Sequence, residues 1–548
     1  MENILFIIPP NIKYESFVNP PENVKAVSRR SGTFGAVITD MPLGVMSLSA
    51  YLKKHAAVKT ELIDFNVELN KTDFFEFNSF AEFFDAHLSQ WRRSSVRPPG
   101  IIGISALFTP SYQNMVQIAR SCRKVFPDSL IVAGGGVPTN MYKEIFATCE
   151  SFDALCLGEG EKPLLRLIEA TDGRGFLEED SSWITRQKVQ NGDSFQYDFI
   201  ENLDEIPFLD YEIFDLDNYT LNPTISAYPT VDSRRRGFPL MTSRGCTHHC
   251  CFCAAHTVRG RKMRYYGIER LRLDLERLRK EYGAETIIFQ DDHFMADKQR
   301  AHEVIGILRE LGMTGFFPNS LALYALDRKI LEALKSVGVN QLVLAIESGS
   351  NRVLKEIMHK PLNLSIVERV VKDCRELGIY TDVNILIGLP GETGGDIEDA
   401  RIFLRSVGAN WFRINVATPL VGSEMLDICL KKDYIKGNYI DCDYKKAIVE
   451  TEDFTSEYIQ EMAYVLNLDL NFVNNSDFRL GDYRMALKGF ANAIRAKSDH
   501  AIAHYYMARS HDELGDRKRA QTYMDEAKRI VAESPFWRKY VDMFNIPL

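Results

Sequence analysis

The stretch Leu130-Ile131-Val132-Ala133-Gly134-Gly135-Gly136 joins a short apolar run to three consecutive glycines. A run of this length that ends in glycine is typical of a strand buried on both faces of a sheet. Ile4-Leu5-Phe6-Ile7-Ile8 has the same character and is ended by Pro9-Pro10-Asn11. We therefore expect a buried parallel sheet that begins near the amino terminus.

Other short apolar runs predict further strands of the same sheet, at residues 61–65, 101–105 and 154–157. Amphipathic segments such as 44–54 and 111–125 lie between them, so the hydrophobic period switches from strand to helix and back. This alternation predicts a doubly wound, Rossmann-like α/β domain over residues 1–185.

In such a sheet a ligand sits beyond the carboxyl ends of the strands. Here those ends carry residues 9–11, 105–109, 134–139 and 158–161. Glycine at these positions lets the backbone approach a ligand closely. The same glycines could simply turn the chain, so a ligand site and a plain turn remain alternatives.

Residues 186–238 lose the alternation and predict a linker. From Pro239 to about residue 440 the βα pattern returns, which predicts an open, partial (β/α)6 barrel with its active site at the carboxyl ends of the strands. The expected strands are residues 239–242, 286–290, 315–318, 341–346, 381–387 and 411–416.

The last block, residues 441–548, reads as all-helical. Within it Leu480-Gly481-Asp482 recurs as Leu514-Gly515-Asp516, an offset of 34 residues that equals the tetratricopeptide period. We expect a TPR-like segment over about 477–532. Its role is either to cap the barrel or to bind a peptide.

Composition narrows the class of protein. The chain has 548 residues, with 66 Lys and Arg and 75 Asp and Glu, which gives a formal charge of -9. This negative charge argues against general electrostatic binding to nucleic acid. No apolar stretch reaches the roughly 18 to 20 residues of a membrane span, and no signal peptide opens the chain. We expect a cytoplasmic protein that has no membrane span and does not bind nucleic acid, while a local basic patch remains an alternative.

Four of the ten cysteines lie in Cys246-Thr247-His248-His249-Cys250-Cys251-Phe252-Cys253, directly after the first barrel strand. In a reducing cytosol this clustering indicates a metal rather than disulfides. Three thiolates can hold an iron–sulfur cluster with one iron open, whereas zinc could take a histidine of the same segment as fourth ligand. The place at the catalytic rim of a barrel favours the cluster, with Cys251 packing in the core.

The zinc alternative would draw on His248, His249 or His256. The cysteines outside the segment are interpreted as buried hydrophobic residues. They are Cys122, Cys149, Cys156, Cys374, Cys429 and Cys442.

Cys246, Cys250 and Cys253, with aromatic Phe252 before the last, resemble the CxxxCxxC signature of radical SAM enzymes. The resemblance implies a [4Fe-4S] cluster whose open iron binds S-adenosylmethionine (SAM). The residues it assigns to SAM are Phe252, Gln290, Asp291, Asp292, Glu347, Ser348, Leu386 and Gly391. Helix capping is the alternative role for the three carboxylates among them.

The first block is similar to the cobalamin-binding domain that precedes the barrel in B12-dependent radical SAM enzymes. The residues that this resemblance assigns to cobalamin are Pro10, Asn11, Leu43, Gly44, Ser105, Leu107, Gly134, Gly135, Gly136, Val137, Gly158 and Glu159. The DxHxxG loop of many other cobalamin proteins is absent, since Asp85-Ala86-His87 is displaced and lacks the glycine. Cobalt would lack a lower histidine, and loss of cobalamin stays an open alternative.

The resemblance implies a cobalamin-dependent radical SAM methyltransferase that moves a methyl group from methylcobalamin to an unactivated carbon. A cyclase or rearrangement enzyme with the same cofactors is the nearest alternative, and a zinc-stabilised helical-repeat interaction protein is the alternative from another class. The implied partners are a small-molecule or peptide substrate and an electron donor such as flavodoxin or ferredoxin. The sequence assigns no catalytic residue beyond the cysteine loop.

Overall fold

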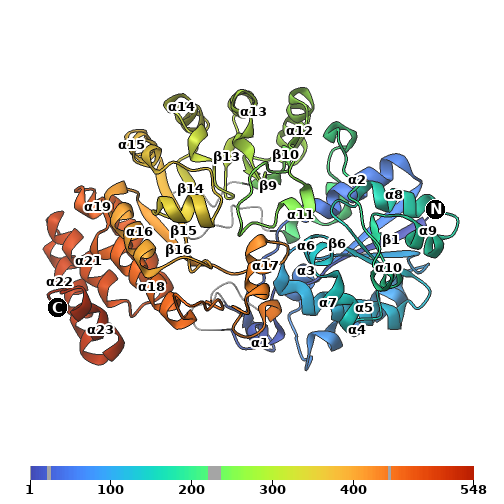
Figure 1. Ribbon diagram of the computed structural model, residues 1–548, viewed down its shortest axis with the longest axis horizontal. Helices are drawn as coiled ribbons and strands as arrows, with labels where there is room; N and C mark the ends of the chain where they lie inside the picture. The colour runs from blue at the N-terminus through green and yellow to red at the C-terminus, as the bar shows by residue number, and fades with distance from the viewer. Residues whose placement is uncertain (1, 21–25, 220–235, 442–445) are drawn as a thin grey trace.

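The computed structural model describes residues 2–20, 26–219, 236–441 and 446–548. An amino-terminal α/β lobe and a carboxyl-terminal helical block lie at opposite ends of the molecule, and a strand-and-helix arch lies between them (Figure 1). Within the described ranges, no helix has both the length and the apolar character needed to cross a membrane.

The first lobe is built on a six-stranded sheet of order β4-β1-β5-β6-β7-β8. Every neighbouring pair is parallel except β7 and β8, which pair antiparallel. The strands are β1 (Glu2–Ile8), β4 (Val58–Asp64), β5 (Ile101–Ser105), β6 (Leu130–Gly134), β7 (Ala154–Cys156) and β8 (Trp183–Ile184). The predicted doubly wound sheet is confirmed.

Helices cover both faces of this sheet. On one face α4 (Phe80–Ser94) and α5 (Tyr112–Val125) pack with the aromatic core around Phe65. On the other face α2 (Leu43–His55) and α8 (Glu161–Glu169) pack over Phe6 and its neighbours. Because both faces are apolar, the strands read as continuous hydrophobic runs in the sequence.

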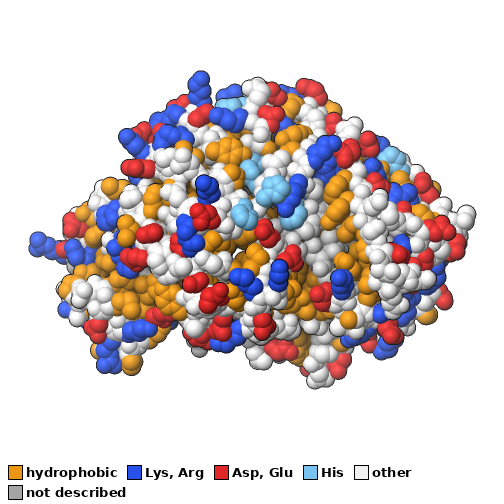
Figure 2. All heavy atoms as spheres, in the orientation of Figure 1, with side chains coloured by type: hydrophobic (Ala, Val, Ile, Leu, Met, Phe, Trp, Pro, Cys, Tyr) orange, Lys and Arg blue, Asp and Glu red, His pale blue; other side chains and the backbone are white. Residues whose placement is uncertain are grey.

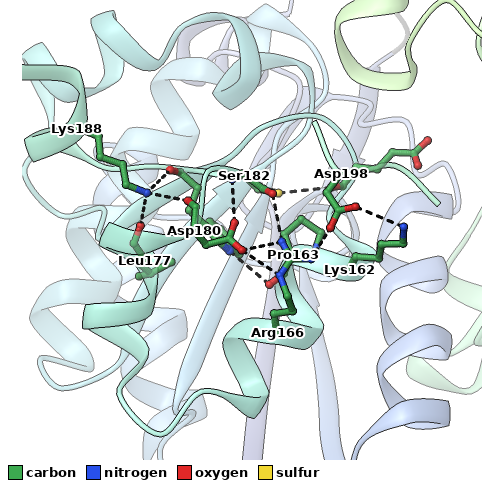
Figure 3. A network of polar contacts seen from close by, with 11 residues as sticks. Lys162, Pro163, Arg166, Leu177, Asp180, Ser182, Lys188 and Asp198 are labelled. Atoms are coloured by element: carbon green, nitrogen blue, oxygen red, sulfur yellow. Dashed lines mark hydrogen bonds and ion pairs between the residues drawn. The ribbon is translucent and has the colours of Figure 1, made fainter. Parts of the chain in front are cut away.

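Residues after 185, where the sequence predicted the linker to begin, still pack against the edge of the sheet. The short helix α10 (Arg186–Asn191) places Lys188 so that its ammonium group donates to the carbonyl oxygens of Leu177, Asp180 and Trp183 at 2.7 to 3.0 Å (Figure 3). Arg166 of α8 is held in the same region by Asp180 and Asp198. These contacts fix the edge strand β8 to the lobe.

The arch is the partial barrel that the sequence predicts. Its strands are β9 (Gly237–Leu240), β12 (Thr286–Phe289), β13 (Thr314–Phe316), β14 (Gln341–Glu347), β15 (Tyr380–Ile387) and β16 (Trp411–Val416). They pair in parallel as β9-β12-β13 and β14-β15-β16, and a parallel bridge between Leu321 and Leu344 joins the two halves.

Helices that alternate with the barrel strands cover the outside of the arch (Figure 1). They are α12 (Ile268–Glu281), α13 (Lys298–Glu310), α14 (Arg328–Ser336), α15 (Val367–Glu376) and α16 (Gly394–Val407). Because the strands are parallel, their carboxyl ends share one rim, where the candidate site lies.

The helical block packs against the end of the arch through buried carboxylates. Asp469 is fully buried and accepts from Arg401 and Arg405 of α16 at 2.7 and 2.8 Å. Asp477 similarly accepts from Arg375 at 2.8 Å. These ion pairs join helices after residue 455 to the barrel, as expected for a cap.

The repeated motif marks equivalent helix starts. Gly481 and Gly515 both have φ of +78°, and the Asp that follows each caps the next helix. The helices of the block are α18 (Ser456–Leu468), α19 (Ser476–Arg479), α20 (Tyr483–Ala496), α21 (Ala501–Glu513), α22 (Arg517–Glu533) and α23 (Pro535–Met543). Peptide binding by this block stays a prediction.

A buried cluster of four charges joins the first lobe to the barrel. Arg264 donates twice to Glu159 at 2.8 Å, and Arg244 donates to Glu161 at 2.8 Å and lies 3.2 Å from Glu159. Both arginines belong to the small hairpin of β10 (Ser243–Arg244) and β11 (Arg264–Tyr265). All four side chains are at most 10% exposed. This cluster sets how the two lobes meet.

We expect Glu159→Gln to lower the free energy of unfolding by about 3 kcal/mol, because it leaves two buried guanidinium groups without their shared anion. Glu201→Gln breaks an exposed ion pair with Lys262 and should cost less than about 1 kcal/mol. Urea denaturation followed by circular dichroism measures both. Equal losses in the two variants would show that the buried cluster contributes no more than a surface pair.

Candidate active site

A cavity of about 1280 Å³ lies between the sheet of the first lobe and the rim of the barrel. Most residues assigned to cobalamin from the sequence line it. These are Asn11, Leu43, Gly44, Ser105, Leu107, Gly134, Gly135, Gly136, Gly158 and Glu159. The other two lie behind this surface: Pro10 is buried with its carbonyl bonded to Asn114, and Val137 is part of the core. The predicted loops therefore face one space.

The glycines of the β6 loop allow two strand ends to meet closely. Gly135 has φ of +106°, and a Cβ there would lie 2.5 Å from the carbonyl oxygen of Ala106. At Gly136 a Cβ would lie 2.6 Å from the carbonyl oxygen of Leu107. Any side chain at either position would force the β5 and β6 loops apart, so the glycines keep this wall of the cavity continuous.

The wall fits a large flat ligand such as a corrin. A Cβ at Gly44 would meet open space, and Leu107 and Phe108 expose 49% and 56% of their surface. No histidine occurs among the described residues that line the cavity. His87 instead lies on α4 with its ring against Phe65, so it offers no lower cobalt ligand.

The cysteine loop forms part of the opposite wall. It runs from β10 to α11 (His256–Arg259), and Cys246 and Cys253 line the cavity. Cys250 is half-buried beside them. Cys251 is buried, and its backbone is bonded to Met358 and Met425, which agrees with the packing role predicted for it.

Burial favours the protonated form of the three thiols of the loop. Burial raises the pKa of Cys246 and Cys253, and raises the pKa of Cys250 to about 11, while the nearby Lys360 ammonium opposes each shift. Since metal binding requires thiolates, loading would release protons. Three half-buried thiols on one loop fit a cluster that leaves a fourth corner free.

Adjacent carboxylates at the end of β12 take different roles. Asp291 is buried and accepts from the Thr242 backbone, the Thr242 hydroxyl and the Ser243 hydroxyl, so it is engaged within the protein. Asp292 lines the cavity; Arg259 donates to one of its oxygens at 2.8 Å, while its other oxygen is buried without a partner. Of this pair, Asp292 is the one placed to meet a polar ligand.

The remaining residues assigned to SAM lie around the same rim. Gln290 lines the cavity, and Phe252 packs against the barrel core. Glu347 follows a bulge in β14 and has φ of +67°; burial raises its pKa, and Lys360 lies 3.8 Å from it. A non-glycine residue in this conformation indicates strain held by its surroundings.

Three more of these residues follow strands β14 and β15. Ser348 is buried and accepts from the Ser350 backbone. Leu386 is partly buried on β15 and packs against the core. Gly391 has φ of +88°, and its carbonyl accepts from Arg352. Whether SAM contacts them stays a prediction.

Sequence reasoning missed Glu392. This carboxylate is fully buried and accepts from the backbone amides of Gly388 and Leu389 at 2.6 and 3.1 Å, which fixes the loop after β15. Its other oxygen is buried without a partner, and burial raises its pKa to about 7. The available signal was an acidic residue directly after the run of Gly388, Leu389 and Gly391.

A second group that was missed lies beside the cysteine loop. His293 is buried, bonds through Nε2 to the Tyr324 hydroxyl at 2.7 Å, and has its ring centre 4.7 Å from that of His248. Burial, with the nearby His248 and Lys360, lowers the pKa of His293 to about 4. The imidazole is therefore neutral near pH 7 and shares a hydrogen bond with the Tyr324 hydroxyl.

Comparison with known proteins matches the two lobes separately. Residues 39–168 match the B12 binding domain family, and residues 240–404 match the Radical SAM superfamily. A cytidylyl-2-hydroxyethylphosphonate methyltransferase of Streptomyces wedmorensis is 29% identical over 68% of this chain and 75% of its own. An uncharacterized methyltransferase of Pyrococcus horikoshii is 26% identical over 81% of this chain and 90% of its own.

A solved structure shares the whole architecture. The radical SAM methyltransferase TsrM of Kitasatospora setae, solved with cobalamin and a [4Fe-4S] cluster, aligns with a TM-score of 0.55 over 97% of this chain and all of its own, at 13% identity. At this identity the likeness establishes the fold.

These findings define a class of protein. The chain contains a B12 binding domain followed by a radical SAM domain, and it is an enzyme. Cobalamin, SAM and a [4Fe-4S] cluster, the cofactors expected from the sequence, are those of the two matched families. The alternative of a zinc-stabilised interaction protein is therefore not supported.

We expect the stability of the chain to depend on pH through Glu392. Its folded pKa of about 7 lies above the ordinary value of 4.5, so its contribution is complete below pH 4.5 and is lost as the pH rises through 7. Glu392→Gln cannot ionise. Its stability relative to the natural chain should therefore rise by about 3 kcal/mol across this range.

Urea denaturation at the two ends of the pH range measures this effect. Glu398→Gln, at an exposed position of the helix α16 that follows the same loop, is the control and should keep a constant difference from the natural chain. A constant difference for Glu392→Gln as well would contradict the assignment.

Proposed function

We propose that the protein is a cobalamin-dependent radical SAM C-methyltransferase, which moves a methyl group from methylcobalamin to an unactivated carbon of a small-molecule substrate. One observation carries the proposal: Cys246 and Cys253 line the same cavity as the glycine loops of the first sheet. Groups bound at the two walls would face each other across one cavity.

When bound, the cluster with SAM supplies an organic radical and cobalamin supplies the methyl group. The residues of this chain would hold and align these groups. The three thiolates would hold the cluster, and Gln290 and Asp292 would accept hydrogen bonds from polar groups of SAM. The loops at Gly44 and Gly134–Gly136 would present a flat surface to the corrin.

Apolar walls support this role by excluding water from a reactive centre. Leu43, Leu420 and Val421 line the cavity from both lobes. Water exclusion protects a radical from side reactions and strengthens the polar contacts that remain. The closest functional support is that both relatives named above are methyltransferases. An electron donor such as flavodoxin or ferredoxin would reduce the cluster.

Anaerobic reconstitution with iron, sulfide and hydroxocobalamin, followed by incubation with trideuteromethyl-SAM and a metabolite extract, tests the proposal. We expect 5′-deoxyadenosine, S-adenosylhomocysteine and a metabolite with a trideuteromethyl increment. Protein prepared without cobalamin should give neither of the last two. A product without added methyl would instead indicate a cyclase or rearrangement enzyme, and methyl transfer without cobalamin would refute the proposal.

Neighbouring cysteines provide a matched pair for the cluster assignment. Cys250→Ala should lose the complement of about four irons and nearly all 5′-deoxyadenosine formation, because the cluster loses one of three ligands. Cys251→Ala removes a buried thiol of the core and should keep the iron at a cost of about 1 kcal/mol in stability. Iron analysis and product chromatography measure both. Undiminished SAM cleavage by Cys250→Ala would exclude the cluster.

A further inference from the structure

The segment that contains the cysteine loop is strongly basic. Between Arg244 and Glu269 the chain has no Asp or Glu, although its overall charge is -9. The same segment holds four fixed cations and three histidines. They are Arg259, Arg261, Lys262, Arg264, His248, His249 and His256.

Three of the four fixed cations are neutralised by carboxylates from other parts of the chain. Arg264 is held by Glu159 at 2.8 Å, and Arg259 by Asp292 at 2.8 Å. Lys262 pairs with Glu201 at 2.6 Å on the surface. These cations already have structural roles, so they need no further anion.

Arg261 differs from the other three. Its Nη1 donates to the backbone carbonyl of His248 at 2.6 Å, and no carboxylate of the described residues lies within ion-pair distance of it. A guanidinium group has five N–H donors, so several remain for a ligand. Arg261 is half-buried, which strengthens any charged contact that it makes.

Two histidines of the same segment, His249 and His256, lie near Arg261 and offer further hydrogen-bond donors. Figure 2 shows histidine side chains gathered in the middle of one face, next to Lys and Arg side chains. His249 itself is exposed, so this group of basic residues opens to solvent.

We propose that Arg261, with His249 and His256 beside it, binds an anionic group of the methyl acceptor, a phosphate, phosphonate or carboxylate. This inference rests on the proposed function and specifies its substrate class. The planar guanidinium fork matches the geometry of such oxyanions and can hold one through two parallel hydrogen bonds.

The position of Arg261 favours the acceptor over SAM as the source of the anion. Arg259 and Asp292 line the inner cavity together, where the residues assigned to SAM also lie. Arg261 comes two residues later and lies next to the exposed His249. Arg261 is not among the described residues that line this cavity, so an anion held by it would lie beside the residues assigned to SAM rather than among them.

Titration of the reconstituted, SAM-loaded full-length protein with inorganic phosphate, followed by ³¹P NMR, tests the site. We expect Arg261→Gln to raise the phosphate Kd by about tenfold, and Arg261→Lys, which keeps the charge without the fork, to raise it less. Lys262→Gln removes the adjacent, already paired cation and should change Kd by less than about twofold.

Two further measurements, the Kd of SAM and the iron content, show whether a variant has lost the anion site alone or has also lost SAM or the cluster. The Kd of SAM should change by less than about twofold in all three variants, and iron content should stay at that of the natural chain. Weaker SAM binding with unchanged phosphate binding in Arg261→Gln would overturn the inference, as would equal phosphate Kd values in every variant. Cobalamin-dependent methyl transfer could still be observed with either result. The proposed function is therefore tested separately, by the methyl-transfer assay described above.

Discussion

The buried charges of Glu159, Glu161, Arg244 and Arg264 are the interaction on which the site depends. Removing four charges from water is costly, and the cluster is tolerable because each charge meets an opposite one and a further hydrogen bond. Ser47 donates to Glu161 at 2.7 Å, and the carbonyl of Ile200 accepts from Arg264 at 2.8 Å. The arrangement allows few alternatives, so it specifies one way for the lobes to meet.

The cysteine loop begins at the end of β10, the strand that carries Arg244. The contacts that join the two lobes therefore also position the loop. At Gly245 a Cβ would lie 2.3 Å from the carbonyl of Lys262, so the loop leaves the hairpin where only glycine fits. Asp291 holds the strand just before it, at Thr242 and Ser243. The loop is thus anchored on the protein side independently of any bound cofactor.

Most strands could be predicted from the sequence, because buried parallel strands are continuous apolar runs and their ends carry the polar residues. The edge strand β8 could not be predicted, since two residues are too few to show a hydrophobic pattern. Its position depends on hydrogen bonds from Lys188, which lies outside the strand. Adjacent side chains point to opposite sides of a strand, so the sequence could not tell that Asp291 faces inward and Asp292 the cavity. Glu159 was assigned to a ligand, but its main partner Arg264 is 105 residues away.

A preformed loop changes the energetics of cofactor loading. Burial raises the pKa of the three thiols and lowers the pKa of His293 to about 4, so these four groups are neutral near pH 7. When iron binds, the thiolates would bring negative charge near Lys360, which lies 3.8 Å from Glu347, and near Arg261, which donates to the carbonyl of His248. Because Asp291 already holds the backbone before the loop at Thr242 and Ser243, little conformational entropy is lost at that step. The basic segment therefore fixes the loop to the rest of the chain through its paired cations, Arg259, Lys262 and Arg264, which meet Asp292, Glu201 and Glu159.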